Sequence, residues 1–278
     1  MANTIGYGQG AVNNTNGWGK SATNNAIDFG EVCADSWSPE TNLTGSSGAF
    51  TNTYSTDYDG IDAYISTDST YSELDGATKA TFSMWIKPTS SSTLIRNVFQ
   101  IGNGSTGGNG VCQLFLYQGN RIDFSISSTS TYGRANISSL NYGSWNHLLI
   151  AIDLDVTDEF KCYLNGFDVT TGDNLGSRTS FATATEPLYI GEYTTGAYTP
   201  FLGNIDEFAI WSGTDLRNDV ATLYNSGVPG NLNDNGLTAP TSWYRFEEGS
   251  GTTIADSGSS TNNATIQNSV TFETDVPS

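Results

Sequence analysis

The sequence has few charged residues and very few basic ones. Charged residues make up 14% of the 278, against roughly 25% in typical globular proteins. Asp and Glu number 29 and Lys and Arg only 10, which gives a formal net charge of -19. Such a surface repels the phosphates of nucleic acids and anionic lipid headgroups. We therefore expect neither a nucleic-acid partner nor a membrane-surface one.

Long apolar runs are also missing. No stretch approaches the roughly 20 apolar residues of a membrane span, so no membrane insertion is expected. The first residues, MANTIGYGQG, do not place a basic segment before an apolar one, as a signal peptide would. We expect synthesis in a cytoplasm, and release by a route such as lysis if the protein leaves the cell.

Cysteine and histidine are scarce. Cys33, Cys112 and Cys162 are far apart and form no C-x-x-C pair, which excludes a disulfide framework and a zinc site. Free thiols are therefore expected. His147 is the single histidine, and it falls inside the apolar strand pattern WNHLLIAID. We expect it to be structural and not a catalytic base.

In place of these residues, the first 43 positions carry a repeat of eleven residues. Each unit has one aromatic residue among glycines, and two units share paired asparagines. The repeated residues are Tyr7, Trp18 and Phe29, with Asn13, Asn14, Asn24 and Asn25. Units so rich in glycine bury too little surface to fold alone. Aromatic anchors dominate many interfaces, so we interpret residues 1–43 as an assembly arm that attaches the protein to partners or to copies of itself. The alternative is a flexible tail of low complexity.

Residues 44–278 read differently, as short alternating strands separated by polar turns. In FSMWIKP, Phe82, Met84 and Ile86 point one way. Gly119-Asn120 and Asn165-Gly166 are hairpin signals. One helix is predicted in TDLRNDVATLYNSG, capped by Thr214 or Asp215. The prediction is an all-β jelly-roll β-sandwich with an extended arm and one short surface helix.

Several segments carry a resemblance to a known family. FSMWIKPTS, GSWNHLLIAID, PLYIGEY, GNIDEFAIW and SWYRFEEGSGTTIADSG are similar to strands of the laminin G-like, concanavalin A-like lectin/glucanase superfamily. The resemblance covers roughly residues 57–272. The last segment usually opens such a domain but here closes it, which indicates a circular permutation. The arm resembles the leading segments of bacteriophage virion proteins.

The resemblance implies two kinds of site. Many members hold a structural calcium near the rim of the sheets, and the matching carboxylates here are Asp59, Asp62 and Asp206. Members that bind sugars stack them on exposed aromatic residues. The loop tyrosines Tyr132, Tyr193 and Tyr198 are the corresponding candidates for carbohydrate binding. The alternatives are that Asp59-Gly60 only forms a turn, that Asp206 only pairs with a backbone amide, and that the tyrosines only line the sheets or the bases of loops. Trp85, Trp145 and Trp211 lie within strand patterns and are predicted to be core.

Hydrolysis is not expected. Glucanases of the superfamily carry a Glu-x-Asp-x-Glu triplet on one strand, and the sequence has none. Asp206 and Glu207 are adjacent and should face opposite sides of their strand. The leading hypothesis is a bacteriophage virion protein, a fibre, decoration or neck appendage. Its arm would bind other virion proteins as a homo-oligomer, and its lectin-like domain would be displayed toward host glycans. A capsid cement protein without glycan binding, and a glycan-active enzyme or its binding module, remain alternatives.

Overall fold

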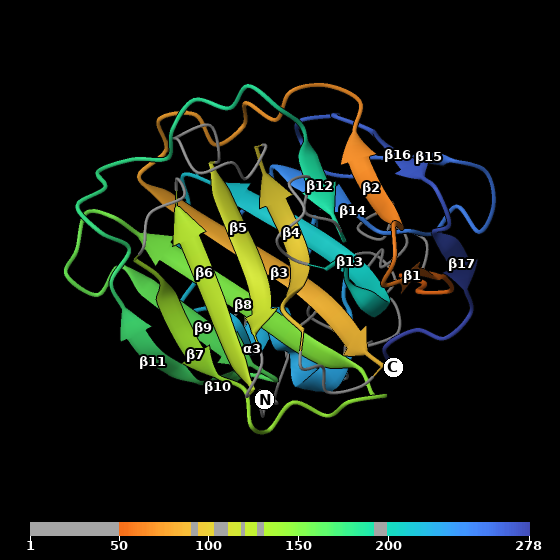
Figure 1. Cartoon of the computed structure of the whole chain (residues 1–278), viewed down its shortest axis with the longest axis horizontal. Coiled ribbons are helices and arrows are strands. Elements are labelled where there is room, and N and C mark those ends of the chain that lie inside the picture. The colour runs from red at the N-terminus through yellow and green to blue at the C-terminus, as the bar shows by residue number, and fades with distance from the viewer. Residues whose placement is uncertain (1–49, 90–93, 103–110, 118–119, 127–130, 192–198) are drawn as a thin grey trace, which may run out of the picture. The chain divides into compact units, whose positions relative to one another are not determined.

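A computed structural model describes residues 50–89, 94–102, 111–117, 120–126, 131–191 and 199–278 (Figure 1). All but the first of these residues belong to one compact unit, Thr51–Ser278. Within it, two antiparallel sheets pack face to face as a sandwich, which confirms the predicted fold class. Figure 1 looks onto β4, β5 and β6 of one sheet, with β3, β8 and β13 of the other behind them.

Every neighbouring pair of strands within the two sheets is antiparallel. The eight-stranded sheet runs, in spatial order, β10 (Phe167–Asp168), β9 (Phe160–Leu164), β8 (Asn146–Asp153), β3 (Lys79–Pro88), β13 (Leu202–Ser212), β1 (Ser55–Asp59) and β17 (Thr271–Glu273), and β14 (Ser242–Tyr244) also pairs with β13. The nine-stranded sheet runs β11 (Thr170–Asp173), β7 (Gly133–Asn136), β6 (Arg121–Ile126), β5 (Cys112–Tyr117), β4 (Arg96–Ile101), β12 (Leu188–Ile190), β2 (Tyr64–Thr67), β16 (Ala264–Gln267) and β15 (Thr253–Ile254).

The core forms between the inner faces of the two sheets. Phe82, Met84 and Ile86 of β3 all lie in it, as the alternating pattern predicts. Aromatic rings join the sheets: Phe82 stacks on Phe99 with ring centroids 5.0 Å apart, and Phe99 meets Phe208 edge-on at 5.3 Å. Such pairs contribute about 0.5–1.5 kcal/mol each beyond their buried area. The core therefore fixes how the two sheets face each other.

The side of the eight-stranded sheet that points away from this core is covered as well. We call it the eight-strand outer face. Trp85, Leu149 and Trp211 point outward from their strands, yet each is buried. Tyr224 lies over this face, with its ring 6.2 Å from that of Trp85 and 5.9 Å from that of His147. A second, smaller apolar layer thus closes this side of the sandwich.

Tyr224 belongs to the helix α3 (Val220–Tyr224), which continues into the 3-10 turn η2 (Asn225–Gly227). The helix is shorter than predicted, and neither Thr214 nor Asp215 caps it. Asp215 instead accepts a hydrogen bond from the backbone N–H of Arg217 and pairs with its guanidinium. This turn occupies the predicted first turn of the helix, so α3 begins after it. Among the described residues, no helix is long and apolar enough to cross a membrane.

Both predicted hairpins are present. β5 and β6 pair from Tyr117 opposite Arg121, on either side of the first turn. β9 and β10 meet around Asn165 and Gly166, whose φ angles are +50° and +84°. Positive φ at both central residues is what a tight two-residue hairpin requires, and Asn-Gly supplies it at low strain. Cys112 and Cys162 are buried free thiols, as expected, while Cys33 lies outside the described residues.

Candidate functional site

The outward side of the nine-stranded sheet, here called the nine-strand outer face, is polar where the opposite face is apolar. Strand register places a row of polar and aromatic side chains across five strands. The members of this row, in spatial order, are Ser66, Tyr189, Gln100, Gln113 and Ser125. Alternation alone explains the row, because the residues between these positions fill the core. Residues 103–110, 127–130 and 192–198, which follow β4, β6 and β12 in the sequence, lie outside the described residues.

A second group on this face comprises two tyrosines, two arginines and one carboxylate. We call Tyr117, Arg121, Asp123, Arg134 and Tyr132 the tyrosine–arginine cluster. The guanidinium of Arg121 lies 4.1 Å from the ring centroid of Tyr117, and that of Arg134 lies 5.5 Å from Tyr132. Asp123 sits between them, with its carboxylate 2.6 Å from Arg121 Nε and 3.5 Å from Arg134 Nε. Ring faces, cationic donors and a carboxylate thus meet in one place.

Two side chains on this face are buried with unused hydrogen-bonding atoms. Asn97, on β4, lies beside Phe115 in the register, and both residues point away from the core. Neither amide atom of Asn97 has a hydrogen-bond partner among the described residues, and the same holds for the Ser125 hydroxyl. Both residues are fully buried. Buried polar groups are nearly always satisfied, so these atoms indicate a place where water or a polar ligand completes the structure.

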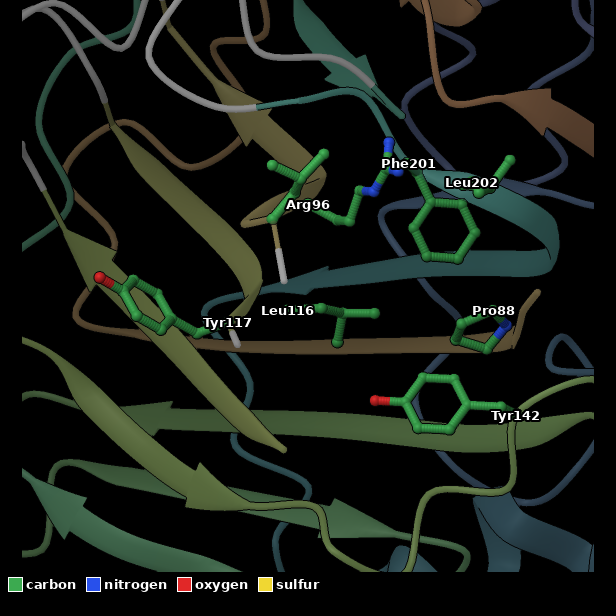
Figure 2. Close-up of a pocket in the computed structure, with 8 residues that line it drawn as sticks. Pro88, Arg96, Leu116, Tyr117, Tyr142, Phe201 and Leu202 are labelled. Atoms are coloured by element: carbon green, nitrogen blue, oxygen red, sulfur yellow. The ribbon is translucent and has the colours of Figure 1, made fainter. Parts of the chain in front are cut away.

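Figure 2 shows a small hollow at one end of the sandwich, where Arg96 lies near Phe201 and Leu202, with Tyr142 on the other side. Its volume is about 20 Å³, enough for one water and not for a sugar. Arg96 Nη1 donates to the carbonyls of Gly60 and Pro200, at 3.1 and 2.9 Å. We therefore interpret Arg96 as a structural residue that connects β4 to the segments around Gly60 and Pro200.

The adjacent acids Asp206 and Glu207 do not face opposite sides of β13, so that prediction is wrong. The register between β13 and β3 shifts between Asp206 and Ala209, and Glu207 has a φ of +49°. This is a β-bulge, in which two residues oppose one on the partner strand. Ile205 and Phe208 on either side both enter the core. Asp206 and Glu207 therefore share the eight-strand outer face.

Both carboxyl groups of this pair are buried. Glu207 accepts hydrogen bonds from Trp243 Nε1 at 2.6 Å and Arg245 Nε at 3.2 Å. Asp206 accepts one from Asn52 Nδ2 at 2.9 Å and another from the Glu207 N–H. Burial, opposed by Arg245, raises the pKa of Glu207 to about 8, and burial together with the Glu207 charge raises the pKa of Asp206 well above its usual range. The pair thus retains a proton near neutral pH.

The three predicted calcium ligands are not brought together. Asp59 and Asp62 both accept a hydrogen bond from the Ser269 hydroxyl, at 2.6 and 3.1 Å. Asp59 also accepts from three backbone N–H groups of its own turn, and the Ser269 bond is the main cause of its lowered pKa. Asp206 lies four residues beyond Leu202, the partner of Asp59 on β13. Within the described residues, no three His, Cys, Asp or Glu side chains group as a metal site. Calcium binding itself stays a prediction.

Of the predicted sugar-binding tyrosines, the structure places one. Tyr132 is half-buried and directly precedes β7, beside Arg134 of the tyrosine–arginine cluster. Tyr193 and Tyr198 lie outside the described residues, as do the arm residues Tyr7, Trp18, Phe29, Asn13, Asn14, Asn24 and Asn25. Whether any of them binds a partner stays a prediction.

Sequence reasoning missed most of the cluster and misplaced one tryptophan. Arg121, Asp123 and Arg134 are spread over two strands, and only the register brings them together. Trp85 and Trp211 are buried in strands as predicted. Trp145 is only half-buried: it precedes β8, and its Nε1 donates to Asp275 at 2.9 Å. His147 is buried as expected, 2.8 Å from the Ser83 hydroxyl, and burial lowers its pKa to about 3.

Comparison with known proteins identifies the sandwich. The family model of the concanavalin A-like lectin/glucanases superfamily matches residues 59–221. A putative carbohydrate binding protein from Bacteroides ovatus is 17% identical with a TM-score of 0.59, over 82% of this chain and 62% of that one. A heptameric SAP-like pentraxin from Limulus polyphemus is 16% identical with a TM-score of 0.50, over 62% of this chain and 82% of that one. No curated protein matches the sequence. At these identities, likeness to solved structures shows the fold alone.

Proposed function

The chain belongs to the concanavalin A-like lectin/glucanases superfamily, and on that premise we propose that its nine-strand outer face binds glycans without cleaving them. The observation that carries the proposal is the tyrosine–arginine cluster beside buried, unsatisfied amide and hydroxyl groups. Sugars present apolar C–H faces and a ring of hydroxyls, so they suit tyrosine rings next to polar side chains. The B. ovatus relative is described as a putative carbohydrate binding protein, which supports this choice of ligand.

The environment of the acids supports binding over hydrolysis. Glycosidases need one carboxylate and one carboxylic acid on either side of the scissile bond. Asp123 on this face makes two contacts to the Arg121 guanidinium, which give it a structural role in the cluster. Asp206 and Glu207 have the raised pKa of a general acid, but they are buried on the other sheet. We therefore assign neither set a role in sugar chemistry.

The proposal extends to where the domain is used. We infer that residues 1–43 attach it to a bacteriophage particle, as a fibre, decoration or neck appendage. The eleven-residue aromatic repeat and the resemblance of this segment to virion proteins support the inference. A cement protein would share the arm but show no glycan binding. A glycan-active enzyme would release product from its polymer. These outcomes separate the alternatives.

A glycan array probed with the full chain tests the binding claim, followed by titration of the best oligosaccharide. Tyr117→Ala and Arg134→Gln should each weaken binding about tenfold, because each removes one side of the cluster. Tyr163→Ala is the matched control, since Tyr163 is a half-buried tyrosine on β9 of the other sheet. Equal losses in all three variants, or no binding by the parent chain, would overturn the assignment.

The attachment claim has its own test. The native mass of the full chain is compared with that of a chain starting at Gly45, and both are assayed for incorporation into particles that lack the protein. The proposal expects the shortened chain to keep its glycan affinity but lose oligomerisation or incorporation. Normal incorporation without the first 44 residues would remove the basis for the virion role.

A further inference from the structure

A second concave site lies on the opposite side of the sandwich from the nine-strand outer face. It is an open cleft with a volume of about 520 Å³, within the 300–1,000 Å³ typical of small-ligand pockets. Trp85 lies beneath Tyr224, and Trp145 contributes a further part of the lining. Trp145 is half-buried, so part of its ring is open to a ligand. We call this site the tryptophan cleft.

The rim of the cleft is rigid because a buried polar network holds it. Asn146 is fully buried, and its amide donates to the carbonyls of Asn141 and Ser144 at 2.9 and 2.8 Å. Its Oδ1 accepts from the Asn141 N–H at 3.1 Å and from Asn165 Nδ2 at 3.3 Å. Asn165 in turn accepts from the His147 N–H at 2.8 Å. The turn before Trp145 is therefore fixed in advance, which lowers the entropy lost when a ligand binds.

The polar lining of the cleft contains both hydrogen-bond donors and acceptors. Lys87 and Asp275 form an ion pair at the cleft, so an ammonium donor lies beside a carboxylate acceptor. Asn141 and Ser144 are exposed, and neither side chain has a hydrogen-bond partner among the described residues. Because the Lys87 and Asp275 charges cancel, the pair selects against a strongly charged ligand. Neighbouring hydroxyls, each both donor and acceptor, fit such a lining.

We propose that the tryptophan cleft binds a neutral pyranose saccharide. One face of the sugar ring packs on Trp145, and its hydroxyls reach Asn141, Ser144 and the Lys87–Asp275 pair. The inference shares its ligand class with the proposed function but none of its residues. If both sites bind, the domain has two saccharide sites on opposite sheets and can bridge two sugar chains.

The test uses neutral tetrasaccharides of glucose, galactose, mannose and xylose, added one at a time to the full, ¹⁵N-labelled chain. The readout is the indole N–H resonance of Trp145, which the Trp145→Phe variant assigns by its loss. We expect this resonance to shift in a saturable way with at least one saccharide. The paired change Asn141→Ala and Ser144→Ala should weaken that response about fivefold with unchanged Tm, because both side chains are exposed.

The outcomes separate this inference from the proposed function. Tyr117→Ala should leave the Trp145 response intact, since Tyr117 lies on the other sheet. If only amides of the nine-strand outer face shift, the proposed function stands and the tryptophan cleft is rejected as a site. If only the Trp145 resonance shifts, the tryptophan cleft stands as a saccharide site and the proposed site on the nine-strand outer face is rejected. If the Trp145 resonance responds to none of the four saccharides, the cleft assignment is wrong. Glycan binding by the nine-strand outer face is then judged from the glycan array alone.

Discussion

The two outer faces of the sandwich arise from the same strand alternation but have opposite contents. On the eight-strand outer face, Trp85, Leu149 and Trp211 point outward and are buried beneath a second apolar layer. On the nine-strand outer face, the corresponding positions hold Gln113, Ser125 and the tyrosine–arginine cluster. One face stabilises the fold mainly by burying apolar area, whereas the other carries Asn97 and Ser125, whose side chains have no hydrogen-bond partner among the described residues. A face of the second kind is where a ligand is expected.

This contrast has an energetic consequence. Burying apolar surface contributes about 25 cal/mol per Å², while an unsatisfied buried polar group costs about 1–3 kcal/mol. Substitutions on the eight-strand outer face should therefore lower stability and leave saccharide binding by the other sheet unchanged. Substitutions on the nine-strand outer face should weaken saccharide binding and change stability little. The predictions below test this separation.

The largest effect is expected for Trp211→Ala. Trp211 is 1% exposed, and its Nε1 donates to the Thr238 carbonyl at 2.7 Å. The change removes a large buried ring and leaves that carbonyl without its donor, so urea unfolding should show a loss of about 3–5 kcal/mol. Tyr117→Ala on the other face serves as the control and should lose less than about 1 kcal/mol. Similar losses of unfolding free energy in the two variants would show that the two faces do not differ in their contribution to stability.

A smaller loss is expected from the helix that covers the eight-strand outer face. Leu223→Ala truncates a buried side chain of α3 and should lower the free energy of unfolding by about 2–3 kcal/mol. The exposed neighbour Thr222 provides a matched control, because Thr222→Ala removes no buried contact. If Leu223→Ala is as mild as the control, α3 does not seal this face.

The acid pair gives the eight-strand outer face a pH dependence. A carboxyl whose pKa is raised in the folded state binds more protons there than in the unfolded chain, so stability falls as pH rises between the two pKa values. For Glu207 that window runs from 4.5 to about 8. Asp206→Asn removes a buried carboxyl whose own pKa is raised, so it should reduce the decline, measured by urea unfolding at pH 5 and pH 9.

His147 changes the stability in the opposite direction with pH, so its contribution must be distinguished from that of the two carboxyls. Its pKa falls from 6.5 to about 3 on folding, so it lowers stability only as pH drops through that range. Asp206→Asn should leave this acid limb unchanged. An unaltered slope between pH 5 and pH 9 in the variant would show that the carboxyls do not share a proton.

The smallest change in stability is expected on the nine-strand outer face. Ser125→Ala removes a buried hydroxyl that has no hydrogen-bond partner among the described residues, so the free energy of unfolding should stay the same or rise by up to about 1 kcal/mol. Affinity for the best array glycan should nevertheless fall. A variant that loses stability and keeps its affinity would show that Ser125 serves the fold and not a ligand.

The sequence predicted the sandwich and its core well, because alternation over Phe82, Met84 and Ile86 depends only on local pattern. It failed where structure depends on register. The bulge that turns Asp206 and Glu207 to one side leaves no local signal, since neither residue is glycine. Trp145 fits a strand pattern but precedes the strand, and it is held at the surface by distant Asp275. The arginines of the cluster meet only through strand pairing.

The central claim is that saccharides bind the nine-strand outer face through the tyrosine–arginine cluster, independently of the tryptophan cleft on the other sheet. Mapping backbone amide shifts in the full chain, with the best array glycan added, tests this directly. The account predicts that the largest shifts fall in β5, β6 and β7, around Phe115, Ser125 and Arg134, while those of β13 stay unchanged. A response at Trp145 and α3 would be assigned to the tryptophan cleft. Shifts centred on β13 and α3, with β5 and β6 silent, would contradict it.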